Sequence, residues 1–114
     1  MWLYTSSGFL SVVEDRSDPN KLYVRSRESA VFEDLFKGFE VIHTPNADYE
    51  WRVHVDKGEF GTILYNEIFN IDYDNFKDHV KVASPHLEYC YNRVYYATYT
   101  LGEDDERVRF VAIN

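Results

Sequence analysis

Two segments of the chain alternate between apolar and polar residues, and both place basic side chains on the polar face of a predicted strand. The outward positions are Tyr23, Arg25 and Arg27 in residues 22–27 and Arg52 and His54 in residues 50–55. Because guanidinium groups form paired hydrogen bonds with carboxylates and phosphates, these residues predict recognition of an anionic group. The interpretation that the sequence favours is nevertheless a solvated face on which Glu14 and Glu50 pair with the arginines across strands.

Tyrosines are concentrated in a helix predicted to begin at Ser84, a capping residue followed by proline. They are Tyr89, Tyr91, Tyr95, Tyr96 and Tyr99. Helical spacing places them on more than one face, so one buried stripe cannot hold them all. Exposed tyrosines are enriched at protein interfaces, which predicts a partner-binding surface. The alternative is that they cover the sheet with their hydroxyls in solvent.

The other polar residues form no catalytic motif. Cys90 falls on the apolar face of the same helix, and a buried cysteine is favoured over a reactive pair with His86. The histidines lack metal-ligand spacing. We expect Asp72 to cap a short helix containing Asn75 and Lys77 rather than to bind magnesium. The sequence therefore favours a non-enzymatic protein without a metal or cofactor.

Composition narrows the class of protein. The 114 residues suit one domain, and 20 acidic against 12 basic residues give a net charge of -8, which disfavours binding to nucleic acid. No apolar run approaches the ~20 residues of a membrane span, and the N-terminus lacks the pattern of a secretory signal. With a single cysteine, the chain is predicted to be cytoplasmic, without membrane contact. Aromatic residues make up 18% of the chain, which is the most unusual feature of its composition.

Periodicity predicts the elements. Strands are expected at residues 1–5, 9–14, 22–27, 40–44 and 50–55, with a helix over 31–39. A second helix follows a capping box formed by Asp56 and Glu59. Its predicted buried residues are Phe60, Ile63, Leu64, Ile68 and Ile71. A short helix around Phe76 and Val80 comes next. The helix from Ser84 to Gly102 is predicted to bury Leu87, Cys90, Tyr91, Val94, Thr98 and Leu101.

This order of elements predicts one α+β domain over residues 1–114, with an antiparallel sheet and helices packed on one face. One possible connectivity is ferredoxin-like, although the N-terminal hairpin departs from it. Residues 103–114 are predicted to be a C-terminal strand or tail.

Several short segments of the chain, taken together, form a recognisable sequence pattern. They are residues 1–5 (Met-Trp-Leu-Tyr-Thr), 8–9 (Gly-Phe), 24–27 (Val-Arg-Ser-Arg), 44–45 (Thr-Pro), 47–49 (Ala-Asp-Tyr) with Arg52, and 71–77 (Ile-Asp-Tyr-Asp-Asn-Phe-Lys). Over residues 1–80 the chain thereby resembles a family of small uncharacterised proteins of bacteria and their phages, from which residues 103–114 depart. The resemblance implies a compact one-domain protein. The matched polar positions are Arg25, Arg27, Asp48, Tyr49, Arg52, Asp72, Asn75 and Lys77.

Three functional hypotheses follow. The first is a non-enzymatic protein-interaction module or small regulator, of phage type and acting on a host protein, with self-association as a homodimer as a related prediction. The second is a small anion- or nucleotide-binding protein or enzyme that uses the arginine face. The third is an acidic mimic of nucleic acid. The candidate binding residues are Arg25, Arg27, Tyr49, Arg52, His54, Asp72, Asn75, Lys77, Tyr89, Tyr95, Tyr96 and Tyr99.

Overall fold

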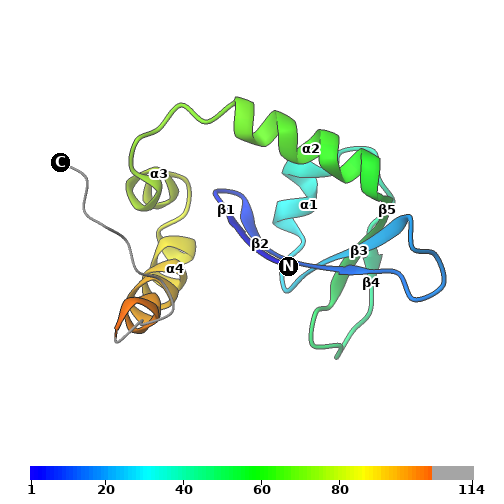
Figure 1. Cartoon of the computed structure of the whole chain (residues 1–114), viewed down its shortest axis with the longest axis horizontal. Coiled ribbons are helices and arrows are strands. Elements are labelled where there is room, and N and C mark those ends of the chain that lie inside the picture. Colours follow the sequence, from blue (N-terminus) through cyan, green and yellow to red (C-terminus); the bar gives the residue numbers. More distant parts are fainter. Residues whose placement is uncertain (104–114) are drawn as a thin grey trace, which may run out of the picture.

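The computed structural model of the chain describes residues 1–103, so the predicted strand or tail at 103–114 lies outside the described residues apart from Glu103. A five-stranded sheet comes first in the chain and most of the helices follow it (Figure 1). The elements are β1 (Trp2–Thr5), β2 (Gly8–Glu14), β3 (Lys21–Ser26), α1 (Ala30–Leu35), β4 (Ile42–His43), β5 (Trp51–Asp56), α2 (Lys57–Phe69), α3 (Phe76–Ala83), α4 (Pro85–Ala97) and the 3-10 helix η1 (Thr98–Gly102). The α+β class is confirmed.

The strands lie in the order β1-β2-β3-β5-β4, and every neighbouring pair is antiparallel. The segment β3-α1-β4-β5 has the split β-α-β order of a ferredoxin-like fold, because β5 lies between two strands that are parallel to each other. The rest of the ferredoxin-like order is not followed within residues 1–103, because α2 leads to α3 and not to a further strand of the sheet. Here α1 leads to β4 at the sheet edge, and β5 returns between β4 and β3.

The core lies between one face of the sheet and the helices α1 and α2. The sheet contributes the alternating residues Leu10, Val12, Val24, Val53 and Val55, all buried. As predicted, α1 buries Val31, Phe32 and Leu35, and Phe36 follows them. The hairpin at Gly8 requires glycine, because its φ is +151° and a Cβ there would lie 2.9 Å from the Cβ of Val31.

Helix α2 packs over α1 in its first half and then runs past the sheet (Figure 1). Phe60 is buried, and Ile63 and Leu64 pack against the core as predicted. Burial of Ile68 and Ile71 was a wrong prediction, since they are 67% and 51% exposed. Periodicity identifies an apolar stripe but does not tell how far the layer beneath it extends.

The N-terminal ends of the later helices differ in detail from expectation. Asp56 is the N-cap of α2, but its side chain makes no capping hydrogen bond and lies 3.6 Å from Lys21. Asn75, not Asp72, caps α3 by accepting the amide of Asp78 at 3.1 Å. Helix α4 begins after Ser84 as predicted, with the Ser84 hydroxyl accepting the amide of Leu87.

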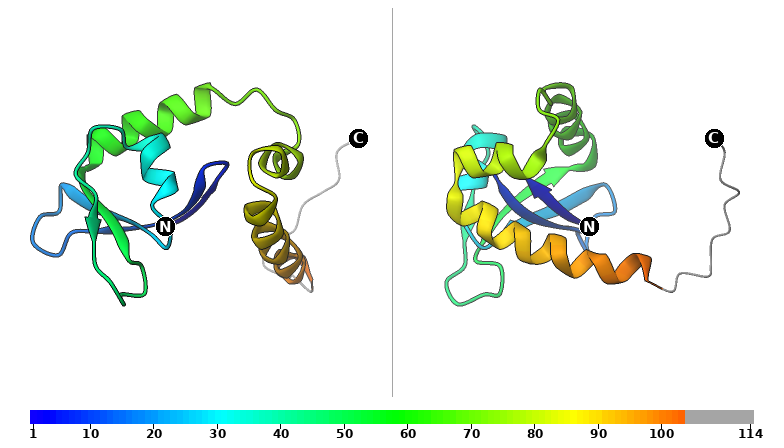
Figure 2. Two further views of the ribbon diagram at one scale, coloured as in Figure 1. Left: turned by 180° about the vertical axis from the view of Figure 1, so that it is seen from behind. Right: turned by 90° about the vertical axis from the view of Figure 1, so that its left-hand side faces the viewer.

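Helices α3 and α4 form a hairpin beside the strands β1 and β2 (Figure 2). Tyr91 fixes α4 to the sheet: its hydroxyl donates to the carbonyl of Thr5 at 2.8 Å, and its ring meets that of Tyr4 edge-on. The predicted buried face of α4 is correct for Tyr91, and Leu87 and Val94 are half-buried. It is wrong for Cys90, Thr98 and Leu101, which are exposed. Within residues 1–103, no helix has the length and apolar character of a membrane span.

Candidate functional site

The sheet face opposite α1, called here the open face, is defined by strand register. Ser11 pairs with Arg25, Arg25 with Arg52, and Arg52 with Ile42, which makes one row across four strands. In the next row Val13 pairs with Tyr23 and Tyr23 with His54. The polar residues predicted to share a face, Tyr23, Arg25, Arg52 and His54, therefore lie together on it.

Arg25 and Arg52 are direct cross-strand partners at the centre of the open face. Nη2 of Arg25 donates to Oγ of Ser11 at 2.9 Å, and the guanidinium of Arg52 lies 6.0 Å from the ring centre of Tyr23. The Nε atoms of both arginines are buried and have no acceptor among the described residues. Like charges directly across a strand pair destabilise it, and a buried donor without an acceptor adds a further cost. An anion bound by the two guanidinium groups would offset the repulsion between them.

The solvated-face alternative needed Glu14 and Glu50 to pair with these arginines, and they do not. Glu14 binds Nζ of Lys57 at 2.8 Å, and Glu50 accepts the backbone amide of Asn46 at 3.1 Å. No ion pair within residues 1–103 includes Arg25 or Arg52.

A polar hollow of about 500 Å³ opens beside the two arginines. Its lining is Val13, Glu14, Asp15, Arg16, Ser17, Tyr23, Arg25 and Arg52. Arg16 is the third arginine of this lining. The sequence did not predict it as a binding residue, because it lies in the turn after β2 and not on a strand. Strand alternation gives no signal for Arg16, because β2 ends at Glu14 and the position of the turn depends on how the chain bends there.

Asp15 is the buried carboxylate of the hollow. It accepts the backbone amide of Ser17 at 2.8 Å and lies 2.5 Å from Nε2 of His54. The Ser17 amide, aided by His54, holds the pKa of Asp15 below its ordinary value. His54 also stacks on Tyr23 with ring centres 4.7 Å apart. The predicted binding residue His54 is thus engaged in holding Asp15 and Tyr23.

The ring of Tyr49 lies close to Arg25 of β3 and to Arg27, which directly follows β3. The guanidinium groups of Arg25 and Arg27 lie 4.8 and 4.7 Å from its ring centre, which is cation–π distance. Arg27 also binds the side chain of Asp48 at 2.7 Å, and this hydrogen bond raises the pKa of Arg27. Arg27 therefore belongs to the cluster through Tyr49, but its charge already has a partner.

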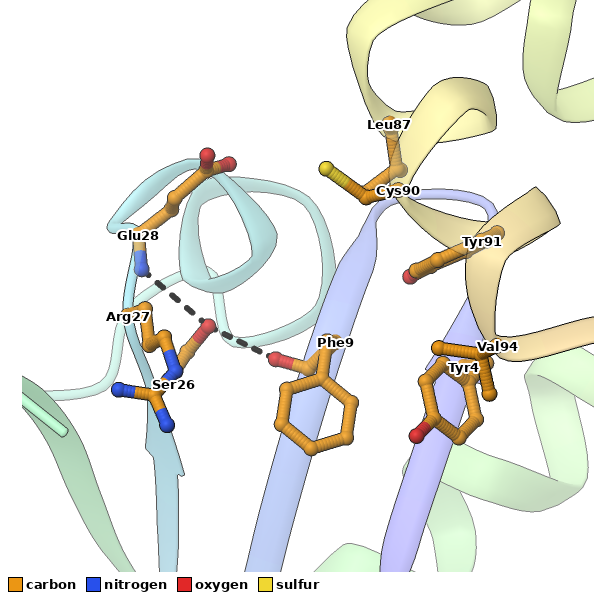
Figure 3. A pocket seen from close by; sticks show the side chains of 9 residues that line it. All are labelled: Tyr4, Phe9, Ser26, Arg27, Glu28, Leu87, Cys90, Tyr91 and Val94. Carbon is orange, nitrogen blue, oxygen red and sulfur yellow. Dashed lines mark hydrogen bonds between the residues drawn. The ribbon is translucent and has the colours of Figure 1, made fainter. Parts of the chain in front are cut away.

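An apolar pocket of about 280 Å³ lies between α4 and the strands β1, β2 and β3. In Figure 3, Tyr4 and Phe9 face Tyr91 and Val94 across it, and Ser26 bridges the carbonyl of Phe9 and the amide of Glu28. Cys90 lies at this pocket, with its Sγ 4.0 Å from Nε2 of His86. The expectation of a core cysteine is corrected, because the short α3–α4 hairpin leaves Cys90 exposed.

The remaining predicted binding residues lie on or next to the α3–α4 hairpin, away from Arg25 and Arg52. Asn75 and Lys77 line a second hollow of about 370 Å³, and Nζ of Lys77 lies 4.3 Å from the ring centre of Tyr95. Asp72 is exposed in the loop before α3. The structure thus divides the candidate residues into an arginine group and a tyrosine group.

The tyrosine group is a cluster on the outer surface of α4 and η1. Ring centres of Tyr95, Tyr96 and Tyr99 lie within 5.3–5.9 Å of one another, and all three are exposed. The hydrogen bond with Tyr95 raises the pKa of Tyr99. Tyr89 is also exposed, but it lies near Arg93 instead of joining this cluster.

Among the described residues, no three His, Cys, Asp or Glu side chains gather in a way that could hold a metal ion. Comparison of the chain with protein-family models, curated proteins and solved structures finds no match. The resemblance drawn from residues 1–80 stays a prediction.

Proposed function

We propose that the protein is a non-enzymatic binding module that recognises an anionic group on its open face. The observation that carries this proposal is the pair Arg25 and Arg52, adjacent across β3 and β5, neither of which has an ion-pair partner among residues 1–103. The two carboxylates that line the hollow are engaged elsewhere, Glu14 with Lys57 and Asp15 with His54.

The chemistry of the hollow favours a group with several oxygens, such as a phosphate or a carboxylate. A guanidinium offers a planar fork of donors that such a group accepts in pairs. The net charge of -8 repels anions at long range, but physiological salt screens charges beyond about 8 Å. Recognition therefore depends on the local arginines rather than on steering by the whole molecule.

Thermal denaturation with and without ligand tests this proposal. The probes are inorganic pyrophosphate and ATP, which represent small anions, and a poly-glutamate peptide, which represents a partner's carboxylates, all at matched ionic strength. A ligand at 100 times its dissociation constant adds about 2.7 kcal/mol of stability, which raises the melting temperature measurably.

The variant Arg25→Gln/Arg52→Gln should lose the shift. The variant Arg93→Gln, changed on α4 outside the hollow, should keep it. A shift of equal size in both variants, or no shift with any probe, would contradict the proposal.

Protein recognition by the tyrosine cluster is a second candidate function, favoured by the exposure of Tyr95, Tyr96 and Tyr99 beside Lys77. A partner captured by the wild-type protein should be lost with Tyr96→Ala/Tyr99→Ala and retained with Arg25→Gln/Arg52→Gln. The reverse pattern would assign the partner to the open face instead.

A further inference from the structure

Helix α2 carries a second apolar stripe on the side away from the core. Tyr65, Ile68 and Phe69 are 64%, 67% and 76% exposed, and the rings of Tyr65 and Phe69 stack at 6.0 Å. At about 100° of rotation per residue, Ile68 and Phe69 lie within about 60° of Tyr65 around the helix. The core-facing residues Phe60, Ile63 and Leu64 lie about 100–160° away from Tyr65.

The same stripe continues toward the N-terminus of α2 as two glycines. Gly58 and Gly61 lie within about 40° of Tyr65 by the same helical geometry. Both are exposed, and a Cβ placed on either would meet no neighbouring atom within 4 Å. Glycine inside a helix is unfavourable relative to alanine, and nothing in the single chain requires it here. The stripe thus has large apolar side chains at its C-terminal end and glycines at its N-terminal end.

We infer that this stripe is the interface of a symmetric dimer, in which α2 packs antiparallel against α2 of a second copy. In an antiparallel pair centred on position 63, Tyr65 of one copy lies over Gly61 of the other, and Ile68 lies over Gly58. Large residues then meet small ones twice, related by the two-fold axis, as an isologous interface requires. The glycines allow the two helix backbones to approach closely.

Charge and area agree with a second copy as the occupant. The acidic residues of α2, Glu59 and Glu67, lie about 120° and 160° around the helix from Tyr65, outside the stripe. The three large side chains of two copies offer on the order of 800 Å², taking about 150–250 Å² for a buried aromatic side chain. With the glycine surface that they cover, the total approaches the lower end of specific interfaces, about 1,200 Å².

Sedimentation velocity over concentrations from micromolar to submillimolar tests the dimer. The wild-type protein should shift from monomer to dimer as concentration rises, and Ile68→Asp should stay monomeric. The control Val82→Asp changes a side chain that is 89% exposed on α3, and it should associate like the wild type. A wild-type protein that is monomeric throughout, or equal association of wild type and Ile68→Asp, would overturn the inference.

The substitution Gly61→Leu tests the dimer interface without disturbing the fold of the single chain. Its side chain has open space in the single chain, so far-UV circular dichroism should stay unchanged while association weakens about tenfold or more. Adding Tyr65→Ala should restore association, because the second copy then has room for Leu at position 61. A double variant no better than Gly61→Leu contradicts the antiparallel register. These outcomes do not depend on anion binding at the open face.

Discussion

Arg25 of β3 and Arg52 of β5 are direct cross-strand partners on the open face, and the Nε atom of each is buried without an acceptor among residues 1–103. A sheet gains nothing in stability from this arrangement, because neighbouring like charges repel and unsatisfied donors are costly. The arrangement is consistent with a site that is completed by an anion, and several measurable consequences follow from it.

Replacing one of the two arginines should not weaken the fold. We expect Arg52→Gln to leave the free energy of unfolding unchanged or raise it by up to about 1 kcal/mol at low salt, because one like-charge contact is removed. Urea denaturation measures the change. Leu10→Ala, in the core, provides the contrast and should cost about 2–5 kcal/mol. A loss above about 1 kcal/mol for Arg52→Gln would assign the arginine a structural role instead.

Tyr49 should support anion binding through its ring rather than its hydroxyl. Arg25 and Arg27 both lie over this ring, so Tyr49→Leu removes the surface that positions them. We expect pyrophosphate affinity, measured by calorimetry, to fall about two- to fivefold in Tyr49→Leu. Tyr49→Phe keeps the ring and should bind like the wild type; a matched loss in both variants would argue against stacking.

Asp15 should make stability depend on acid pH. Its pKa in the folded protein lies below the ordinary 3.8, chiefly because the Ser17 amide donates to it. The ionised carboxylate therefore stabilises the fold above pH 3.8, and this contribution disappears as pH falls through the lower, folded-state pKa. In denaturation curves over a pH series, the difference between wild type and Asp15→Asn should be constant near neutrality and shrink below pH 3.8. Parallel pH profiles would show that Asp15 has no such role.

Tyr91 should hold the α3–α4 hairpin to the sheet. Tyr91→Phe removes only the hydrogen bond to the Thr5 carbonyl and should cost about 0.5–1.5 kcal/mol. Tyr91→Ala also removes the ring that packs on Tyr4 and Phe76, and should cost about 3–5 kcal/mol. Urea denaturation measures both, with the exposed Tyr89→Phe as the control expected to change little. Equal stability of Tyr91→Ala and the wild type would mean that the hairpin does not depend on this contact.

The face that holds the arginines could be predicted from sequence because strand periodicity is exact. Once residues 22–27 and 50–55 are strands with their apolar residues inward, Arg25 and Arg52 must point outward. That they are direct partners depends on the register of β3 against β5, which alternation alone does not fix.

The contribution of the turn after β2 could not be predicted in the same way. Asp15 and Arg16 carry no periodic signal, and their place in the hollow depends on how the chain bends after Glu14. The outer stripe of α2 escaped prediction for another reason: Ile68 has the spacing of a core residue, but the sheet ends before reaching it. A pattern of apolar residues predicts which side chains would be stabilised by burial. It does not predict whether another part of the same chain packs against them.

The most direct test of the account observes the two buried Nε groups themselves. In nuclear magnetic resonance spectra of arginine-labelled protein, inorganic pyrophosphate should shift the Nε–Hε signals of Arg25 and Arg52 in a saturable way. The signal of Arg93, outside the hollow, should stay in place at matched ionic strength. The predicted result is a large saturable shift at Arg25 and Arg52 and a smaller one at Arg16 and Arg27. Unmoved Arg25 and Arg52 signals, or shifts of the same size at Arg93, would contradict an anion site on the open face.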